Sequence, residues 1–374
     1  MLLLQARGFS YTDIGTLGAL YWAALILAEI PTGYIGDRLG QRRGLFISAL
    51  VTAAGIGGLG LAHTFLPCAL ALATWAVGTT FRSGTADAWL YSALAESETP
   101  AAYTTVRGRG RAVKLAATAI TAVIGSFLYS KILIAPFLLT TGLLGINAII
   151  VLSFSTVTNP PSRSQSESGH LMTTWRELTQ VFRHPEVRGF VSYTVLLFGL
   201  VEVTRTFIQP IVVGKQVGLP VVAVGGLYAS FNVVAAGVSG VTGAIERIVG
   251  IRRWFLLAPF LLAGSFMLLP VVPAFTVPSF VGMEAIWRVS QTFQSGVVND
   301  WTGDRRRATV LSVVSMSGGV AAIVFRTVGG VLADTAGPLV MLAVLAIVFV
   351  VGGAALLAIT PRFNRETTQS DTSE

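Results

Sequence analysis

Two pairs of oppositely charged residues lie within long apolar segments of this sequence. Glu202 and Arg205 are three residues apart, and Glu284 and Arg288 are four residues apart. Residues at these spacings share one face of an α-helix, where opposite charges can meet. An ionisable group at mid-membrane costs about 2.5–3.5 kcal/mol on insertion scales, so each needs a reason. Two interpretations are open: a polar binding or proton site, or self-neutralised pairs that hold helices together.

Further charged residues within apolar segments include Arg82, Asp87 and Arg326. Arg82 is deep enough to need a charged partner or a watery cavity, whereas Asp87 lies nearer the end of its segment and could equally serve packing or capping. For Arg326 we expect a side chain that extends outward to the membrane surface. No histidine lies in an apolar segment, so carboxylates would have to carry any proton, and a carboxylate paired with arginine carries one poorly until the pair opens.

The composition indicates a membrane protein rather than a soluble one. Of 374 residues, 53% are hydrophobic and only 12% are charged, whereas soluble proteins have about 25% charged residues. The net charge is +8, but basic residues do not cluster with aromatic ones, which argues against nucleic-acid binding. The single cysteine, Cys68, lies in an apolar stretch and is interpreted as a small buried side chain.

Eleven apolar segments have about the 20 residues that an α-helix needs to cross a membrane. Their approximate ranges are 14–35, 45–62, 66–92, 112–130, 132–155, 189–213, 221–245, 253–271, 275–299, 308–332 and 337–359. Nineteen basic residues lie in one set of connecting loops, and only Arg7, Lys131 and Lys215 lie in the other. This bias places the first set, and the C-terminus, in the cytoplasm.

The sequence also matches itself at a shift of 210 residues. Residues that coincide include Gly8, Gly15, Thr32, Gly33, Gly40, Arg42 and Arg43 with Gly218, Gly225, Thr242, Gly243, Gly250, Arg252 and Arg253. Two parallel halves of this kind are an architecture found among membrane transporters. Segment 14–35 matches the second span of the other half, so we expect the helix that would precede Leu2 to be missing, leaving eleven spans of twelve.

The repeat predicts an all-α membrane protein built from two pseudo-repeated helical bundles. We expect an N-terminal bundle of five spans over residues 1–155 and a C-terminal bundle of six spans over 189–360. Residues 156–188 would form a cytoplasmic linker, and 361–374 a disordered cytoplasmic tail. In the linker, Thr174 and Glu177 fit a capping box, which indicates either a short amphipathic helix or a plain connection with helical bias.

The stretch from Gly33 to Arg43 resembles the signature between helices 2 and 3 of the major facilitator superfamily. The matching residues are Gly33, Gly36, Asp37, Arg38, Gly40, Arg42 and Arg43. A weaker second copy contains Glu246, Arg247, Gly250, Arg252 and Arg253. The resemblance implies a role for these residues in gating, because ion pairs at a partly desolvated rim can favour one access state. The alternative is a basic loop that only sets topology.

The resemblance further implies a secondary transporter that moves a small organic solute by alternating access. We expect a monomer in the cell membrane that exports its substrate and is coupled to protons. The alternatives are an uptake permease for a sugar or metabolite, and a truncated protein that no longer transports.

Several motifs of other protein classes are absent from the sequence. It contains no phosphate-binding GxxxxGK[ST] and no metal or catalytic motif, so we expect neither an enzyme nor a cofactor. The family's antiporter signature is a Gly-Pro pair that should fall within 112–130, where this chain has Gly125-Ser126 and no proline. That difference weakens the expectation of proton antiport.

Overall fold

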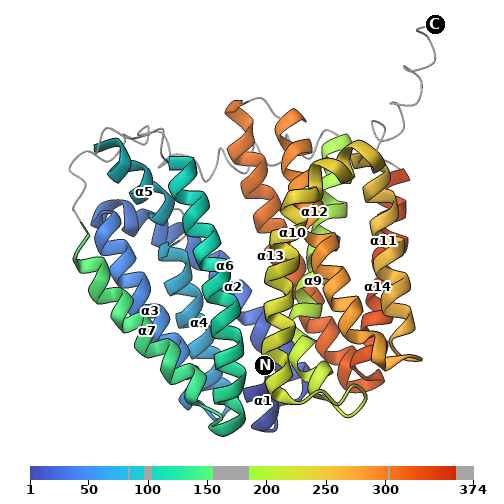
Figure 1. Cartoon of the computed structure of the whole chain (residues 1–374), viewed down its shortest axis with the longest axis horizontal. Helices are drawn as coiled ribbons and strands as arrows, with labels where there is room; N and C mark the ends of the chain where they lie inside the picture. The colour runs from blue at the N-terminus through green and yellow to red at the C-terminus, as the bar shows by residue number, and fades with distance from the viewer. Residues whose placement is uncertain (83–84, 97–102, 155–184, 302–303, 359–374) are drawn as a thin grey trace, which may run out of the picture. The chain divides into compact units, whose positions relative to one another are not determined.

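The computed structural model describes residues 1–82, 85–96, 103–154, 185–301 and 304–358, and every element in this part of the chain is helical (Figure 1). The elements are α1 Leu2–Ala6, α2 Tyr11–Leu39, α3 Gln41–Leu61, α4 Phe65–Arg82, α5 Thr85–Glu96, α6 Tyr103–Lys131, α7 Ala135–Leu152, α9 Pro185–Val213, α10 Val221–Val249, α11 Ile251–Leu268, η2 Pro273–Phe275, α12 Thr276–Trp301, α13 Asp304–Ala336 and α14 Pro338–Ala358. The all-α fold class is confirmed. The linker helix expected near Thr174 and the tail from 361 lie outside the described residues.

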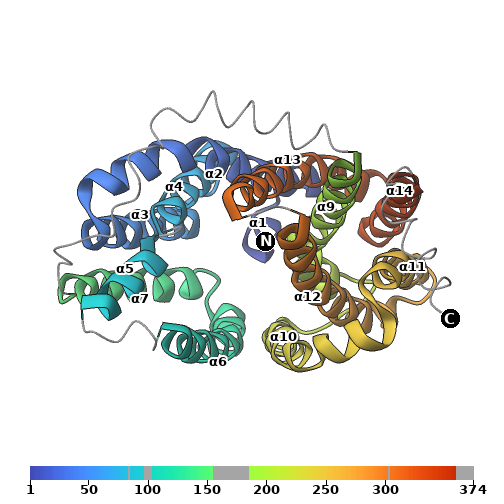
Figure 2. The ribbon, with the colours of Figure 1, turned by 90° about the horizontal axis from the view of Figure 1, so that it is seen from above.

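The chain divides into two compact units. The first contains α1 to α7 and Pro220–Ala229, which includes the start of α10, and the second contains α9, the rest of α10 and α11 to α14. In the first unit α3 packs against α4 and α7, and in the second α9 packs against α13 and α14 (Figure 2). The domain division expected from the sequence, with bundles over 1–155 and 189–360, stays a prediction.

Nine of the described helices are long and apolar enough to cross a membrane. They are Tyr11–Gly36, Gln41–Leu61, Thr105–Lys131, Ala135–Leu152, Arg188–Val213, Val221–Val238, Ile251–Leu268, Val314–Ala336 and Pro338–Ala358. The other two expected spans fall on α4 with α5 and on α12. Helix α12 is less apolar because it carries Glu284 and Arg288 together with several hydroxyl and amide side chains. The count of eleven spans is therefore approximate.

The backbone repeats at the shift found in the sequence. Helices α2 and α10 are each 29 residues long, and both bounds of α10 lie 210 residues after those of α2. Each helix ends at a glycine of positive φ, Gly40 at 79° and Gly250 at 77°. The buried Thr32 and Thr242 both donate to the carbonyl oxygen four residues earlier, each over 2.7 Å. These matches show that the sequence repeat corresponds to a repeated local structure.

Helix α9 is the most buried of the nine candidate spans and forms the centre of the second unit. The Tyr193 hydroxyl on α9 donates to the Phe255 carbonyl oxygen of α11 over 2.8 Å. That carbonyl needs a donor from outside its helix, because Pro259 has no N–H to bond it. Tyr193 and Phe255 are fully buried, so the bond fixes α9 against α11 in the apolar core.

Candidate functional site

Five charged side chains from three helices form one connected ion-pair network in the second unit. Helix α9 supplies Glu202 and Arg205, α12 supplies Glu284 and Arg288, and α13 supplies Arg326. All five positions lie well inside their helices, within segments that are otherwise mostly apolar. The network therefore brings together residues that are up to 124 positions apart in the sequence.

Arg205 is the central member, because its guanidinium contacts both carboxylates. One terminal nitrogen donates to Glu202 Oε1 over 3.2 Å, and the other donates to Glu284 Oε2 over 2.7 Å. The remaining arginines bind the outer oxygens: Arg288 Nε lies 2.7 Å from Glu284 Oε1. An Arg326 terminal nitrogen lies 2.8 Å from Glu202 Oε2. Each carboxylate therefore has both oxygens engaged by arginine.

The network carries one net positive charge, since three arginines share two glutamates. The side chains of Glu284 and Glu202 are only 3% and 11% exposed. Charged hydrogen bonds to a buried carboxylate offset the large cost of removing it from water, and removing one partner leaves an uncompensated charge. The buried carboxylates of Glu202 and Glu284 are therefore stable as charged groups only while their arginine partners remain in place.

Two glycines allow α13 to approach α9 closely enough for Arg326 to reach Glu202. A Cβ on Gly199 would lie 2.6 Å from the Phe325 ring, and a Cβ on Gly329 would lie 2.4 Å from a Val203 methyl carbon. Real Cβ atoms do not approach other atoms so closely, so any larger residue would push the helices apart. Small residues at helix contacts are the usual means of close packing in membranes.

Aromatic side chains cover one side of Arg205. The Arg205 guanidinium carbon lies 5.9 Å from the centroid of the Trp287 ring. The Phe198 ring packs against Trp287 with centroids 5.6 Å apart, and Trp287 is only 4% exposed. A guanidinium over an indole face gains cation–π attraction, and more when both groups are desolvated. The orientation of Arg205 is therefore set by two carboxylates and one ring.

Arg288 is the accessible end of the network. Its side chain is 34% exposed. Among the described residues, only its Nε is used in a side-chain hydrogen bond, to Glu284. The two terminal amino groups of this guanidinium can therefore donate to another partner. A planar guanidinium of this kind is suited to carboxylate, phosphate or sulfonate oxygens.

The sequence correctly predicts that Glu202 meets Arg205 and that Glu284 meets Arg288. It does not predict that Arg205 joins the two pairs into one network. The expectation for Arg326 was wrong: the residue is 9% exposed and paired with Glu202 instead of extending to the membrane surface. The pairing of Arg326 could have been predicted from its position. An unpaired charge inside a membrane is costly, so Arg326 also needs a charged partner.

The signature residues of the first unit surround the turn between α2 and α3. Gly40 has φ 79° and ψ 158°, a conformation that is essentially restricted to glycine. The Arg38 guanidinium carbon lies 4.3 Å from the Tyr34 ring centroid, and Arg42 donates to the Leu152 carbonyl oxygen at the end of α7. These contacts position the turn.

Other members of the first signature form fewer contacts. Arg43 is exposed, Gly33 and Gly36 lie within α2, and the side chain of Asp37 is outside the described part. No ion pair joins two signature residues whose side chains are described.

The second copy forms the corresponding turn between α10 and α11. Gly250 has φ 77° and ψ 149°, and Arg247 Nε donates to the Gly243 carbonyl oxygen over 3.3 Å. Glu246, Arg247 and Arg253 are exposed, and Arg252 is half-buried. The gating role assigned to both copies is not tested by these contacts and stays a prediction.

Two further site candidates, Arg82 and Asp87, lie in the first unit. Arg82 is the last residue of α4 and is exposed. Asp87 lies on α5, and its side chain is outside the described part of the chain. Their proposed role in a binding or proton site therefore stays a prediction.

Comparison with known proteins identifies a family of similar sequence. The family model described as Major Facilitator Superfamily matches residues 1–298 of the 374. No curated protein matches this chain.

Several solved transporters have a similar fold. The nucleoside transporter NupG is 13% identical, with 94% of this chain and 91% of NupG covered and a TM-score of 0.79. A mutant of the peptide transporter POT is 13% identical, with 94% of this chain and 87% of that transporter covered and a TM-score of 0.74. A bacterial homologue of the human lysosomal transporter Spinster is 15% identical, with 97% and 92% covered and a TM-score of 0.70. At such identities the likeness shows the fold alone.

Proposed function

The chain belongs to the major facilitator superfamily, and from this we propose that its ion-pair network is the binding site of a small organic anion. The protein is a multi-pass membrane protein and a secondary transporter, not an enzyme. The family relationship gives the transport class.

The observation that carries the proposal is the open guanidinium of Arg288 in a network with one net positive charge. An anionic group bound to the terminal amino groups of Arg288 would form charge-assisted hydrogen bonds. It would also neutralise the excess charge, which a cation or a neutral sugar would leave in place. Each charged hydrogen bond contributes about 1.5–3 kcal/mol, enough to select an anion over a neutral compound of the same size.

Proton coupling follows from competition for the arginines. Substrate oxygens at Arg288 compete with Glu284 Oε1, which lies 2.7 Å from Arg288 Nε. A carboxylate that loses a guanidinium partner binds a proton more readily. In this scheme Glu284 takes one proton from water when substrate binds and returns it when substrate leaves. Glu202 is the alternative carrier, since Arg205 links the two carboxylates.

We propose export on the general resemblance of the sequence alone. Because the anion and the proton bind together in the scheme above, an inward proton gradient would instead drive uptake of a metabolite, which is the alternative outcome. The excess of basic residues in one set of loops supports a cytoplasmic C-terminus in the cell membrane. The two signature turns would then lie at the cytoplasmic rim. We propose that their charged residues, including Asp37, Arg38 and Arg43 with Glu246 and Arg247, bias the access states.

Flux into reconstituted vesicles tests this function. Radiolabelled organic anions, neutral sugars and organic cations would be compared with and without an imposed proton gradient. We expect saturable flux of at least one anion, accelerated by the gradient, and none of the cations. Flux confined to cations or neutral sugars would overturn the substrate assignment, and flux of an anion insensitive to the gradient would overturn proton coupling.

A matched pair of variants ties the flux to the site. Arg288→Gln removes the open guanidinium and should lower anion flux more than tenfold at substrate concentrations below KM. Arg188→Gln removes the same charge from an exposed position on α9, 17 residues and about 25 Å along the helix from Arg205. It should transport as the unmodified protein does. Equal flux through both variants would show that Arg288 is not part of the binding site.

A further inference from the structure

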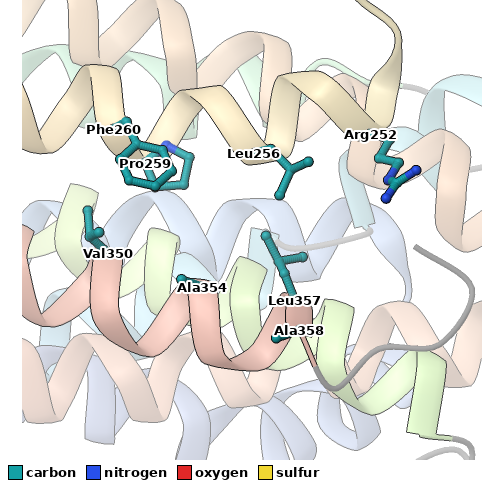
Figure 3. A pocket seen from close by; sticks show the side chains of 8 residues that line it. All are labelled: Arg252, Leu256, Pro259, Phe260, Val350, Ala354, Leu357 and Ala358. Atoms are coloured by element: carbon teal, nitrogen blue, oxygen red, sulfur yellow. The ribbon is translucent and has the colours of Figure 1, made fainter. Parts of the chain in front are cut away.

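An elongated apolar groove lies between α11 and α14, outside the ion-pair network. Its volume is about 220 Å³. Figure 3 shows Phe260 and Val350 at one end, with Leu256 and Leu357 toward the other. The only charged residue among those that line it is Arg252, which lies at the end beside Leu357. The groove thus has an apolar length and a single basic end.

The groove opens on a surface made of apolar side chains. Phe260 is 60% exposed, and the neighbouring Leu257, Leu261 and Val351 are also exposed. Both helices are long and apolar enough to cross a membrane. Such side chains on a spanning helix face lipid, because the hydrocarbon core is as apolar as they are. A molecule that occupies the groove would therefore come from the surrounding lipid bilayer.

The position of Arg252 places it at the membrane boundary. It is the second residue of α11, which is also where the candidate span begins. From Arg252 to Phe260 the helix rises by about 12 Å, at 1.5 Å per residue. One leaflet contributes about 15 Å of hydrocarbon, half of the usual 30 Å. The groove therefore matches the depth of one lipid chain below a headgroup.

The counterpart of Arg252 in the other half has a different environment. Arg42 lies 210 residues earlier, and its guanidinium donates to the carbonyl oxygen of Leu152 at the end of α7. The guanidinium of Arg252 forms no hydrogen bond or ion pair with any other described side chain or carbonyl, and it borders an open groove instead. The two arginines at equivalent signature positions therefore differ. Arg42 binds the carbonyl oxygen at the end of α7, and Arg252 can bind a ligand.

We propose that this groove binds one anionic phospholipid, with an acyl chain between α11 and α14 and the phosphate on Arg252. A zwitterionic lipid would bring a cationic group toward the same arginine, so a headgroup with net negative charge is favoured. Anionic lipids are attracted to basic residues near the membrane surface by about 1 kcal/mol per residue. The site is separate from the transport site and does not depend on the proposed substrate.

Native mass spectrometry of the full chain in detergent tests the proposal. The probes are phosphatidylglycerol and phosphatidylcholine with the same acyl chains, added together at about 0.15 M salt. Diffuse attraction is screened beyond about 8 Å under these conditions. We expect one retained phosphatidylglycerol, and an affinity about fivefold lower in Arg252→Gln, which is 1 kcal/mol converted to a ratio. Arg253→Gln, an exposed neighbour that does not line the groove, should change the affinity less than twofold.

A second variant tests the binding of the acyl chain independently of the binding of the headgroup. Ala354→Leu fills the groove from α14 and should remove lipid retention while Arg252 is unchanged, with gel filtration and circular dichroism to show folded protein. Equal retention of both lipids, or normal retention by Arg252→Gln, would overturn the proposal in favour of ordinary surrounding lipid. Displacement by millimolar inorganic phosphate, with Ala354→Leu behaving normally, would overturn it in favour of a free-anion site.

Discussion

At the scale of single residues, Arg205 and Glu202 determine how the network is connected. Arg205 links α9 to α12 through Glu284, and Glu202 links α9 to α13 through Arg326. Because each carboxylate contacts two guanidiniums, removal of one arginine leaves the carboxylate with one partner rather than none. The network should therefore tolerate loss of an outer arginine better than loss of a glutamate.

Glu284→Gln should destabilise the protein strongly, because Arg205 then keeps only Glu202 and Arg288 loses the carboxylate that it contacts in the network. Breaking a buried pair by removing one partner costs about 3–5 kcal/mol. Equilibrium unfolding in mixed detergent micelles measures the change. Glu246→Gln, at an exposed position of α10, is the control and should shift the unfolding free energy by less than about 0.5 kcal/mol. Equal shifts for the two variants would contradict the energetic role of the network.

A double-mutant cycle on Glu202 and Arg326 should reveal direct coupling. We expect the free-energy effects of Glu202→Gln and Arg326→Gln to be non-additive by about 0.5–3 kcal/mol, as for side chains in contact. The pair Glu202 and Arg188 is the control, since 14 residues of helix place them about 21 Å apart. Additive effects for Glu202 and Arg326 would show that their 2.8 Å contact contributes nothing to stability.

Helical spacing explains why part of this site can be predicted from the sequence. The (i, i+3) and (i, i+4) pairs follow from the geometry of one helix, and Glu202–Arg205 and Glu284–Arg288 were predicted in this way. The Arg326–Glu202 contact depends on how α13 packs on α9, which is decided by Gly199 and Gly329. No periodicity along the chain contains that information.

At the scale of elements, glycines decide how closely α9 and α13 approach and where α2 and α10 end. The spans themselves were predicted from apolar length, whereas their ends shifted where polar residues continue a helix. Helix α2 begins at Tyr11, three residues before the expected start, because Ser10 and Asp13 form a capping box. The Asp13 amide lies 3.0 Å from Ser10 Oγ, which accepts its hydrogen. A helix-capping interaction thus extends the helix beyond its apolar segment.

Gly329→Ala should loosen the contact between α9 and α13. The added Cβ would lie 2.4 Å from a Val203 methyl carbon, and overpacking of this kind costs about 1–3 kcal/mol. Gly264→Ala on α11 meets nothing within 4 Å and should be neutral or stabilising, since alanine is the better helix former by about 1 kcal/mol. Unfolding of both variants in mixed micelles tests the difference. A stabilised Gly329→Ala would show that the close approach is not needed.

Gly250→Ala should destabilise the turn between α10 and α11 even though the space around it is open. The residue has φ 77° and no atom within 4 Å of a Cβ, so any cost comes from backbone strain of about 1–3 kcal/mol. Gly243→Ala, seven residues earlier within α10 and also open, is the control. If both substitutions had the same effect on unfolding free energy, the strain argument would fail.

At the scale of the whole molecule, the chain contains two units with a repeated helix pair and an asymmetric distribution of charge. The ion-pair network lies in the second unit alone, although the signature turns occur in both. Local repetition therefore does not imply that the two units contribute equally to substrate binding. Substrate contacts in the second unit would use a feature that the described residues of the first unit do not repeat.

Cysteine labelling from the two sides of the membrane should establish the orientation. Cys68 is buried, so it gives little background with a membrane-impermeant reagent. Lys215→Cys should be labelled in intact cells, because the loop distribution of basic residues places it outside. Arg247→Cys should be labelled only after permeabilisation. The opposite pattern would invert the topology.

The kinetics of anion transport by Arg288 variants measure how much this guanidinium contributes to substrate binding. Initial rates in reconstituted vesicles would give KM for Arg288→Lys, which keeps the positive charge, and for Arg288→Gln, which removes it. Loss of a charge-assisted hydrogen bond of about 1.5–3 kcal/mol should raise KM more than tenfold in Arg288→Gln, with a smaller increase in Arg288→Lys and none in Arg188→Gln. An unchanged KM in Arg288→Gln would show that Arg288 does not bind the substrate.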